Sequence, residues 1–436
     1  MTAYAHVPPT NRPVIVDAVR TPFLHSGGVF ARYRHHELAA LPLRALLQRY
    51  PGLDQQVELL TVGAVVQELE TTNIAREAGL NAGLAARIPA YSVSMAGVSP
   101  AVGFAHICDM IALGRIQVGL AGGSENFSDL PIRLKRKVRQ RAVKLAFARN
   151  GKDKLRAVAG LWPWDLLPEV PSSKDLSTGL TMGAACEAMV KRFGVSREAA
   201  DAFALRSHLN ACAAWDAGHY TDEVIAVDDR AGAAVGCDDG MRRDTSAQKL
   251  AQLKPAFSSD GVVTAGNASG ITDGAGAQLL MSRQRAQELG TQPLAEVVDY
   301  QLVGVNDLHT EMLLGPAMAI PRLLARHQLQ MNDIHVFELH EAFAAQVLCN
   351  QKALADTSFA QEELGLSQAT GAIPEDRLNC WGGSVALGNP FAGTGTRLLS
   401  TAARRLRASG GRYALTATCA GGGLGAAILL ANPDHS

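Results

Sequence analysis

The 436-residue chain carries 41 Lys and Arg against 41 Asp and Glu, so its formal net charge is zero. This balance excludes proteins that recruit nucleic acid through an overall positive field. The length suffices for two or three domain-sized units, and contents of 47% hydrophobic and 19% charged residues are typical of a soluble globular protein. No apolar run approaches the roughly 18 residues that a membrane span needs.

The N-terminal segment and the cysteines bear on the cellular compartment. Residues 1–13 lack the charged start and apolar core of a secretory signal, and they are short and poor in Arg for a transit peptide. The seven cysteines form no CxxC pair, which disfavours a zinc site and a disulfide framework. We therefore expect a cytoplasmic protein that binds no metal. Six thiols are expected to be buried in a reducing environment, namely Cys108, Cys186, Cys212, Cys237, Cys349 and Cys380.

Strands and helices alternate in the first part of the chain. Short apolar runs predict strands, and longer runs with one apolar face predict helices. The predicted strands are Val14–Val19, the end of Val57–Val66 and Gln117–Gly122, and the predicted helices are His36–Arg49, Asn73–Leu84 and Ala101–Leu113. This order indicates βαβ units and an α/β fold with a covered parallel or mixed sheet.

A similar pattern returns near the C-terminus. The predicted strands there are Ala295–Gly304, His335–Leu339, Tyr413–Thr418 and Ala426–Leu430, and the predicted helices are Ala317–Arg326 and Phe391–Ala408. We interpret the chain as two similar halves, one of residues 1–130 with 250–290 and the other of residues 291–436.

The segment between the halves, 131–250, differs in charge. From Arg133 to Arg156 it holds eleven Lys or Arg and one acidic residue, Asp153, so eleven minus one gives a local charge of +10. Such a run is most often a solvated surface helix. Lys and Arg also supply charge and donors to phosphate, so a phosphate-rich ligand, an anionic membrane surface or a partner protein could use it.

Four short motifs are expected to converge on one site. They are Met95-Ala96-Gly97-Val98-Ser99-Pro100, Leu339-His340-Glu341-Ala342-Phe343, Gly388-Asn389-Pro390-Phe391 and Cys419-Ala420-Gly421-Gly422-Gly423. With these motifs in this order the chain resembles the thiolase family, in the fatty-acid-oxidation branch that carries His-Glu-Ala-Phe. The resemblance runs from about Val14 to Leu430. It implies a thiolase-like fold, stacked in layers, in which the inserted basic loop domain 131–250 covers the coenzyme A site.

The resemblance puts Gly97 at the place of the family's acyl-accepting cysteine. Glycine offers neither a nucleophile nor a proton, so acyl transfer through position 97 is not expected. Ser99 lies two residues on, but without a base its hydroxyl is a weak nucleophile, and a helix-start role is the simpler interpretation. The backbone N–H groups of Gly97 and Gly421 are the implied oxyanion donors.

The resemblance also implies side chains that stabilise an enolate, and this chain retains them in altered form. His340 matches the first residue of His-Glu-Ala-Phe, and Asn389 replaces the histidine of the usual Gly-His-Pro. An imidazole N–H and an amide N–H can both donate to one oxygen, so this pair could still hold an enolate. Cys419 keeps the place of the cysteine that transfers a proton. The implied contacts of coenzyme A are Met182, Ser269 and Phe343.

Three functions stay open. The chain could form or break a carbon–carbon bond on an acyl-CoA without an acyl-enzyme. It could be a non-catalytic acyl-CoA-binding subunit of a fatty-acid oxidation complex, or an ordinary 3-ketoacyl-CoA thiolase with another nucleophile. The resemblance implies acyl-CoA as substrate, no other cofactor, and a homodimer or larger assembly. We expect the dimer to form at the edge of the sheet along Gln117–Gly122.

Overall fold

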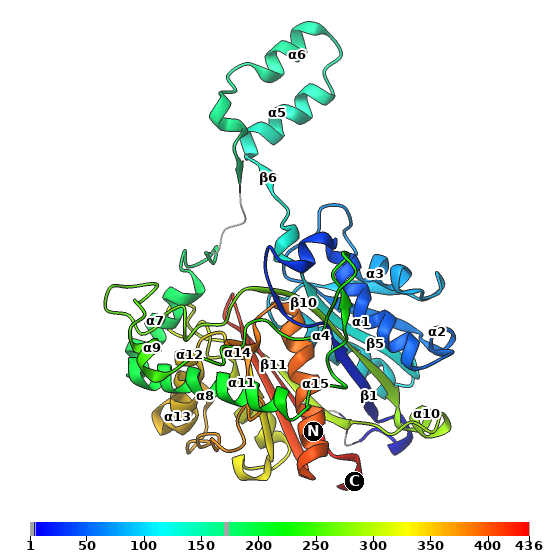
Figure 1. The fold of residues 1–436 in the computed structure, drawn as a ribbon, viewed down its shortest axis with the longest axis vertical. Coiled ribbons are helices and arrows are strands. Elements are labelled where there is room, and N and C mark those ends of the chain that lie inside the picture. The colour runs from blue at the N-terminus through cyan, green and yellow to red at the C-terminus, as the bar shows by residue number, and fades with distance from the viewer. Residues whose placement is uncertain (1–3, 5, 170–173, 436) are drawn as a thin grey trace.

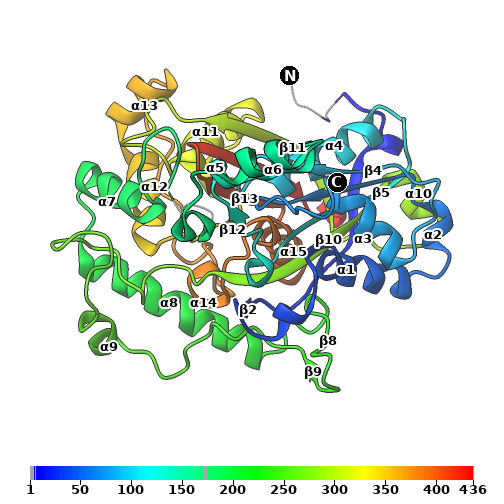
Figure 2. The same ribbon diagram turned by 90° about the horizontal axis from the view of Figure 1, so that it is seen from above.

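The computed structural model describes residue 4, residues 6–169 and residues 174–435. In this part of the chain the main sheet has ten strands, in the order β12-β13-β14-β11-β1-β10-β5-β3-β4, with β2 (Leu24–His25) paired to β10. Helices pack on both of its faces, as Figures 1 and 2 show. None of the described helices is long and apolar enough to cross a membrane.

The strands of the first half form one end of the sheet. They are β1 (Pro13–Arg20), β3 (Leu59–Gly63), β4 (Ala90–Val93), β5 (Val118–Glu125) and β10 (Thr272–Ser282). The first strand, β1, runs antiparallel to the last, β10, which runs antiparallel to β5. Strand β5 in turn runs parallel to β3.

The second half repeats this order. Its strands are β11 (Ala295–Gly304), β12 (Val336–Leu339), β13 (Tyr413–Ala420) and β14 (Leu424–Ala431). Its first strand, β11, is antiparallel to the last, β14, which is antiparallel to β13, which is parallel to β12. Both first strands also shift register just before an aspartate, Asp17 in β1 and Asp299 in β11. These matches confirm the predicted α/β fold with two similar halves.

Two helices lie against both halves of the sheet. Helices α4 (Ser99–Ala112) and α15 (Ala392–Ser409) contact each other, and α15 also contacts strands of both halves. Helices α1 (His35–Arg49) and α3 (Ile74–Ala82) cover the outer face of the first half, while α11 (Gly315–Arg326) covers that of the second and packs on α12 (Ala344–Ala355). The layers therefore bury apolar side chains on both faces of the sheet, which explains why its strands read as apolar runs.

Short elements complete the two halves. They are α2 (Leu53–Gln56), β8 (Val227–Asp228), β9 (Ala234–Val235), α10 (Arg283–Glu288), α13 (Thr357–Leu364) and α14 (Ser384–Leu387).

The basic segment forms a hairpin that projects from the body at the end opposite the C-terminus (Figure 1). Its neck is the antiparallel pair β6 (Arg133–Leu134) and β7 (Pro168–Glu169), and its arms are α5 (Arg136–Ala146) and α6 (Gly151–Val158). The chain then returns to the body as α7 (Met182–Phe193), α8 (Arg197–Asp216) and α9 (Ala247–Ala251), of which α7 and α8 contact α12.

Two expectations about strands are wrong. The run Gln117–Gly122 is not a sheet edge, because β5 lies between β10 and β3, and the edge strand of this half is β4. The strand in Val57–Val66 occupies the middle of the run, at Leu59–Gly63, and all of its residues are buried. Burial on both faces removes the alternation by which a half-buried strand is recognised.

Candidate functional site

The loop that carries Gly97 follows edge strand β4 and leads into α4. Ala96 adopts a positive φ of 47°, and Ser99 closes the turn around it. The Ser99 hydroxyl accepts a hydrogen bond from the Met95 amide at 2.7 Å and donates to the Ala96 carbonyl at 2.5 Å. Because this fully buried hydroxyl is used by the backbone, Ser99 acts as a helix-start residue.

Neither conformation nor crowding requires glycine at position 97. Its φ is not in the left-handed region, and a Cβ there would lie 3.4 Å from Ala420 Cβ and 3.7 Å from the Cys419 carbonyl oxygen, both ordinary contacts. By contrast, a Cβ at Gly383 would lie 2.1 Å from Glu341 Cδ. The backbone at position 97 therefore has room for a Cβ, which glycine lacks.

His340 lies just after β12, next to β13, the strand that carries Cys419. Its amide donates to the Ala417 carbonyl at 2.9 Å, and its Nδ1 lies 2.9 Å from Ser384 Oγ. Burial, together with the nearby Arg397 guanidinium, lowers the pKa of His340 to about 3. The imidazole is therefore neutral at physiological pH, and one of its two nitrogens carries a hydrogen.

A buried ion cluster lies behind His340. Glu338 Oε2 is 3.1 Å from Arg397 Nη1, and Glu338 Oε1 is 2.6 Å from Arg405 Nη1. Burial raises the pKa of Glu338, while the two guanidinium groups act in the opposite direction and favour the carboxylate. The cluster ties α15 to β12 and so fixes the strand that carries His340.

Asn389 bridges two other loops of the site. Its Nδ2 donates to Ser269 Oγ at 3.2 Å, and its Oδ1 accepts from Thr394 Oγ1 at 2.8 Å. The Ser269 amide donates to the Ala342 carbonyl at 3.0 Å, within the His-Glu-Ala-Phe loop. One N–H of the Asn389 amide is left for a ligand.

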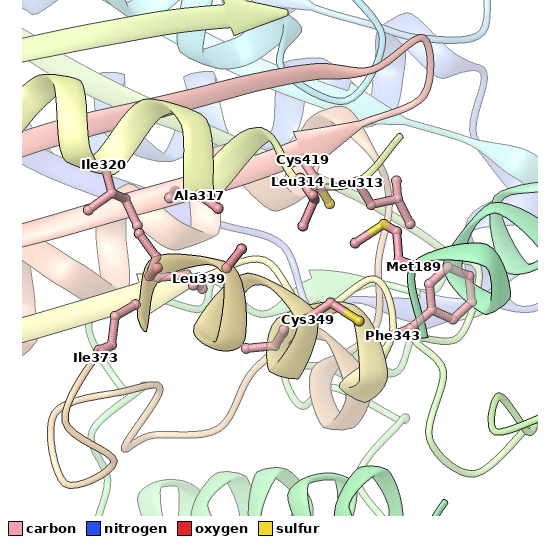
Figure 3. Close-up of a cluster of buried hydrophobic side chains, with 14 of the residues drawn as sticks. Met189, Leu313, Leu314, Ala317, Ile320, Leu339, Phe343, Cys349, Ile373 and Cys419 are labelled. Carbon is pink, nitrogen blue, oxygen red and sulfur yellow. The ribbon is translucent and has the colours of Figure 1, made fainter. Parts of the chain in front are cut away.

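Cys419 lies at the end of β13, where the chain turns through glycines. Figure 3 shows its side chain among buried apolar groups, including Leu313 and Leu314. Burial raises the pKa of the Cys419 thiol to about 12, so its resting form is the protonated thiol. Gly422 and Gly423, with φ of 79° and 70°, turn the chain back into β14.

The other predicted contacts of coenzyme A lie around these groups. Met182 begins α7, and its Sδ would lie 3.4 Å from a Cβ built at Gly421. Phe343 is buried and packs edge-on against Phe257, with ring centroids 6.2 Å apart. The structure thus joins Gly97 to Cys419, Gly421 to Met182, and Asn389 to Ser269 and the loop of His340. The roles of these residues stay predictions.

Sequence reasoning missed four polar groups. Ser384 and Arg397 contact His340 or each other, and Thr394 orients Asn389. Glu341 accepts hydrogen bonds from Ser207 Oγ, Asn379 Nδ2 and the Val385 amide. For Ser384, Arg397 and Glu341 no spacing rule applies, because their partners come from distant segments, whereas Thr394 lies only five residues from Asn389. Among the residues that the structure describes, no group of three His, Cys, Asp or Glu is placed to hold a metal ion.

Comparisons with known proteins agree along nearly the whole chain. The model of the thiolase N-terminal domain matches residues 13–284, and that of the thiolase C-terminal domain matches residues 291–432. The mitochondrial trifunctional enzyme subunit beta of Bos taurus is 42% identical over 419 residues, covering 96% of this chain and 87% of that protein. A 3-ketoacyl-CoA thiolase of Pectobacterium carotovorum is 40% identical over 423 residues, covering 96% of each chain.

Solved structures of thiolase-family enzymes have a similar fold. Human mitochondrial 3-ketoacyl-CoA thiolase in complex with CoA has a TM-score of 0.81 at 29% identity, covering 97% of this chain and 98% of that chain. The Bacillus anthracis acetyl-CoA acetyltransferase has a TM-score of 0.81 at 31% identity, covering 96% and 98%. The chain has the thiolase fold and belongs to the thiolase family.

Proposed function

We propose that this thiolase-family protein is an enzyme that forms or breaks a carbon–carbon bond on an acyl-CoA through an enolate, without an acyl-enzyme at position 97. The observation that carries the proposal is the contrast within one site. His340, Asn389 and Cys419 keep buried, organised polar groups. Gly97 has only its backbone, although a Cβ there would make no contact shorter than 3.4 Å.

The donors suit a thioester oxygen that becomes negative. A neutral imidazole N–H and the free amide N–H of Asn389 can both donate to that oxygen as the enolate forms. The Cys419 thiol can give its proton to the α-carbon of the enolate, and its thiolate can remove that proton in the reverse direction. Each proton transfer between sulfur and carbon therefore also moves the negative charge, between the enolate oxygen held by His340 and Asn389 and the Cys419 sulfur.

Relatives support a second candidate, an ordinary 3-ketoacyl-CoA thiolase. Several similar proteins carry that name, among them the one from Pectobacterium carotovorum. This candidate needs a nucleophile other than position 97, and the Ser99 hydroxyl is held by the backbone. The third candidate, a non-catalytic acyl-CoA-binding subunit, draws support from the similarity to a trifunctional enzyme subunit.

Exchange of α-protons tests the main proposal. The protein should catalyse incorporation of deuterium from heavy water into acetyl-CoA or a longer acyl-CoA, as followed by mass spectrometry. Cys419→Ala should abolish the exchange, and His340→Ala should slow it by about 10²–10³-fold through loss of one oxyanion donor. Cys349→Ala, which removes a buried thiol of the same apolar cluster, is the matched control. Exchange that survives both site changes would mean that the site is assigned wrongly.

The same assay separates the alternatives. Tight acyl-CoA binding without exchange would favour the non-catalytic subunit. An acylated peptide after incubation with a 3-ketoacyl-CoA, together with thiolysis, would favour the ordinary thiolase, whereas the main proposal expects no acylation within residues 92–115.

Restoring both missing groups tests whether their losses are coupled. Gly97→Cys alone should give little thiolysis, because Asn389 cannot take the thiol proton. Gly97→Cys with Asn389→His should recover thiolysis if the rest of the site is still that of a thiolase. Equal activity in the single and double variants would argue against coupling.

We also propose a cytoplasmic homodimer that meets an anionic membrane surface through the hairpin. Edge strand β4 has β3 as its one sheet neighbour in the described chain, so a strand of a second copy could pair with its other side. A monomer mass by light scattering at micromolar concentration would contradict the dimer. The hairpin combines eleven Lys or Arg with exposed aromatic side chains, which suits anionic lipid headgroups.

A further inference from the structure

The imidazole of His340 is held from behind by a short hydrogen-bonded chain. Arg397 Nη2 donates to Ser384 Oγ at 3.3 Å, and Ser384 Oγ lies 2.9 Å from His340 Nδ1. Ser384 and Arg397 are fully buried, and His340 is 7% exposed. Water therefore has little access to this chain, and its hydrogen bonds must be satisfied internally.

Donor and acceptor capacities set the direction of the chain. A guanidinium group can only donate, so Ser384 Oγ accepts from Arg397. The hydroxyl then has one hydrogen of its own to place, and His340 Nδ1 is its second partner among the described residues. If Nδ1 also donated to the hydroxyl, that hydrogen would be buried without a partner, which is costly. Ser384 therefore donates to Nδ1.

The tautomer of His340 follows from this direction. In a neutral imidazole one nitrogen accepts and the other carries the hydrogen. Because Nδ1 accepts from Ser384, the hydrogen is on Nε2, at the far side of the ring from the chain. The opposite tautomer would present a lone pair from Nε2 and would repel a thioester oxygen rather than donate to it.

Ion pairs hold Arg397, the first group of this hydrogen-bonded series, in place. Arg397 is paired with Glu338, which is shared with Arg405, and Arg405 also donates to the Phe337 carbonyl at 2.9 Å. Phe337 and Glu338 belong to β12, the strand that leads directly to His340. The same cluster thus sets both the backbone position of His340 and the guanidinium that orients Ser384.

We infer that Ser384 and Arg397 are positioning residues that hold His340 as the Nε2–H tautomer, so that its imidazole donates to the thioester oxygen of the substrate. This inference rests on the proposed function for its purpose, but the tautomer itself is a property of the free protein. Neither Ser384 nor Arg397 is assigned a contact with substrate.

Nitrogen-15 NMR of the histidine rings provides the direct test. In the unmodified protein, long-range proton–nitrogen spectra should show Nδ1 of His340 as the unprotonated nitrogen, with the signal assigned by its loss in His340→Asn. In Ser384→Ala the His340 signals should shift towards a mixture of tautomers. A hydrogen on Nδ1 in the unmodified protein would overturn the inference, whether or not any variant folds and whether or not exchange is found.

Kinetics separate positioning from general damage. Ser384→Ala should lower kcat for α-proton exchange about tenfold to a hundredfold, as loss of an orienting partner does elsewhere, with KM for acyl-CoA unchanged. Ser384→Thr keeps the hydroxyl and should retain the tautomer. Ser400 lies on the same helix as Arg397, and its buried hydroxyl donates a hydrogen bond to the Ala18 carbonyl. Ser400→Ala removes that hydroxyl and should leave kcat and the His340 signals unchanged. An unchanged tautomer and kcat in Ser384→Ala would refute the inference.

Discussion

The hairpin of residues 133–169 and the interior around His340 differ in how their charged side chains are buried and paired. In the interior, Glu338, Arg397 and Arg405 are almost inaccessible to solvent, and each is paired. On the hairpin, charged side chains stay in solvent beside exposed apolar groups, with Phe147 81% and Leu155 71% exposed. Buried charge must be matched group by group, whereas exposed charge is free to meet a partner.

The hairpin has little core of its own. In α5 and α6 as described, one residue in each is buried, Val138 and Ala157. Trp162 and Trp164 stack on each other with ring centroids 5.1 Å apart and stay more than half exposed. Helices this short are marginal in water unless an apolar face is covered. The hairpin therefore leaves most of its apolar side chains exposed, whereas the charged groups around His340 are buried and paired with one another.

Removal of the hairpin should have the largest effect. Leu134 pairs with Pro168 in the neck, so Asn-Gly could replace residues 135–167 as a tight turn. Because each basic residue near an anionic surface contributes about 1 kcal/mol, the affinity for vesicles with anionic phospholipid should fall at least about a hundredfold. Co-sedimentation measures this, while α-proton exchange in solution should stay unchanged.

Neutral phosphatidylcholine vesicles are the control for that experiment, and they should bind both forms weakly. Equal binding of the shortened and unmodified proteins to anionic vesicles would remove the lipid proposal. In that event a partner protein would be the remaining candidate to bind the hairpin.

Loss of a buried carboxylate should be the next largest effect. Glu338→Ala would leave Arg397 and Arg405 buried without their shared partner, and we expect a loss of about 3–5 kcal/mol in the free energy of unfolding. Arg133→Ala, which breaks the exposed pair with Glu169 in the hairpin neck, should cost less than about 1 kcal/mol. Denaturant unfolding of both variants, with Glu338→Gln as the isosteric control, measures the difference. Similar losses would mean that burial does not distinguish the two regions.

The pH dependence of α-proton exchange should show how burial changes the pKa values of Cys419 and His340. In the proposed mechanism the Cys419 thiolate removes the α-proton, and burial raises the pKa of this thiol to about 12. The exchange rate should therefore rise about tenfold per pH unit from pH 6 to 9, because the thiolate fraction rises in that proportion below the pKa. The exchange rate should show no inflection near pH 6.5 from titration of His340, because the pKa of His340 is lowered to about 3. A plateau beginning below pH 9 would contradict the high thiol pKa.

The smallest expected effect is local to the hairpin. Asn150 caps α6 by accepting a hydrogen bond from the Asp153 amide at 2.9 Å. Asn150→Ala should destabilise that helix by about 1 kcal/mol. The midpoint of global unfolding should not move, because none of the described residues of α6 belongs to the buried apolar clusters of the body. Hydrogen exchange of the α6 amides measures the effect, and Asn150→Ser, which keeps a capping oxygen, should restore protection.

The sequence alone determined the order of the elements, because apolar periodicity is a local property, and its resemblance to the thiolase family located the four motifs. It thus predicted both halves of the sheet and the loops of Gly97, His340, Asn389 and Cys419. It also identified the basic segment, although not as two helices that project from the body.

Only the tertiary structure decided which groups meet. Strand β5 became central rather than peripheral because β10, more than 140 residues later, pairs along it. Ser384 lies 44 residues from His340 and 13 from Arg397, so no local pattern marks it as an orienting hydroxyl. The physical reason is that a hydrogen-bonded chain is selected by burial, which leaves each polar group with the partners that packing provides, and packing depends on the whole fold.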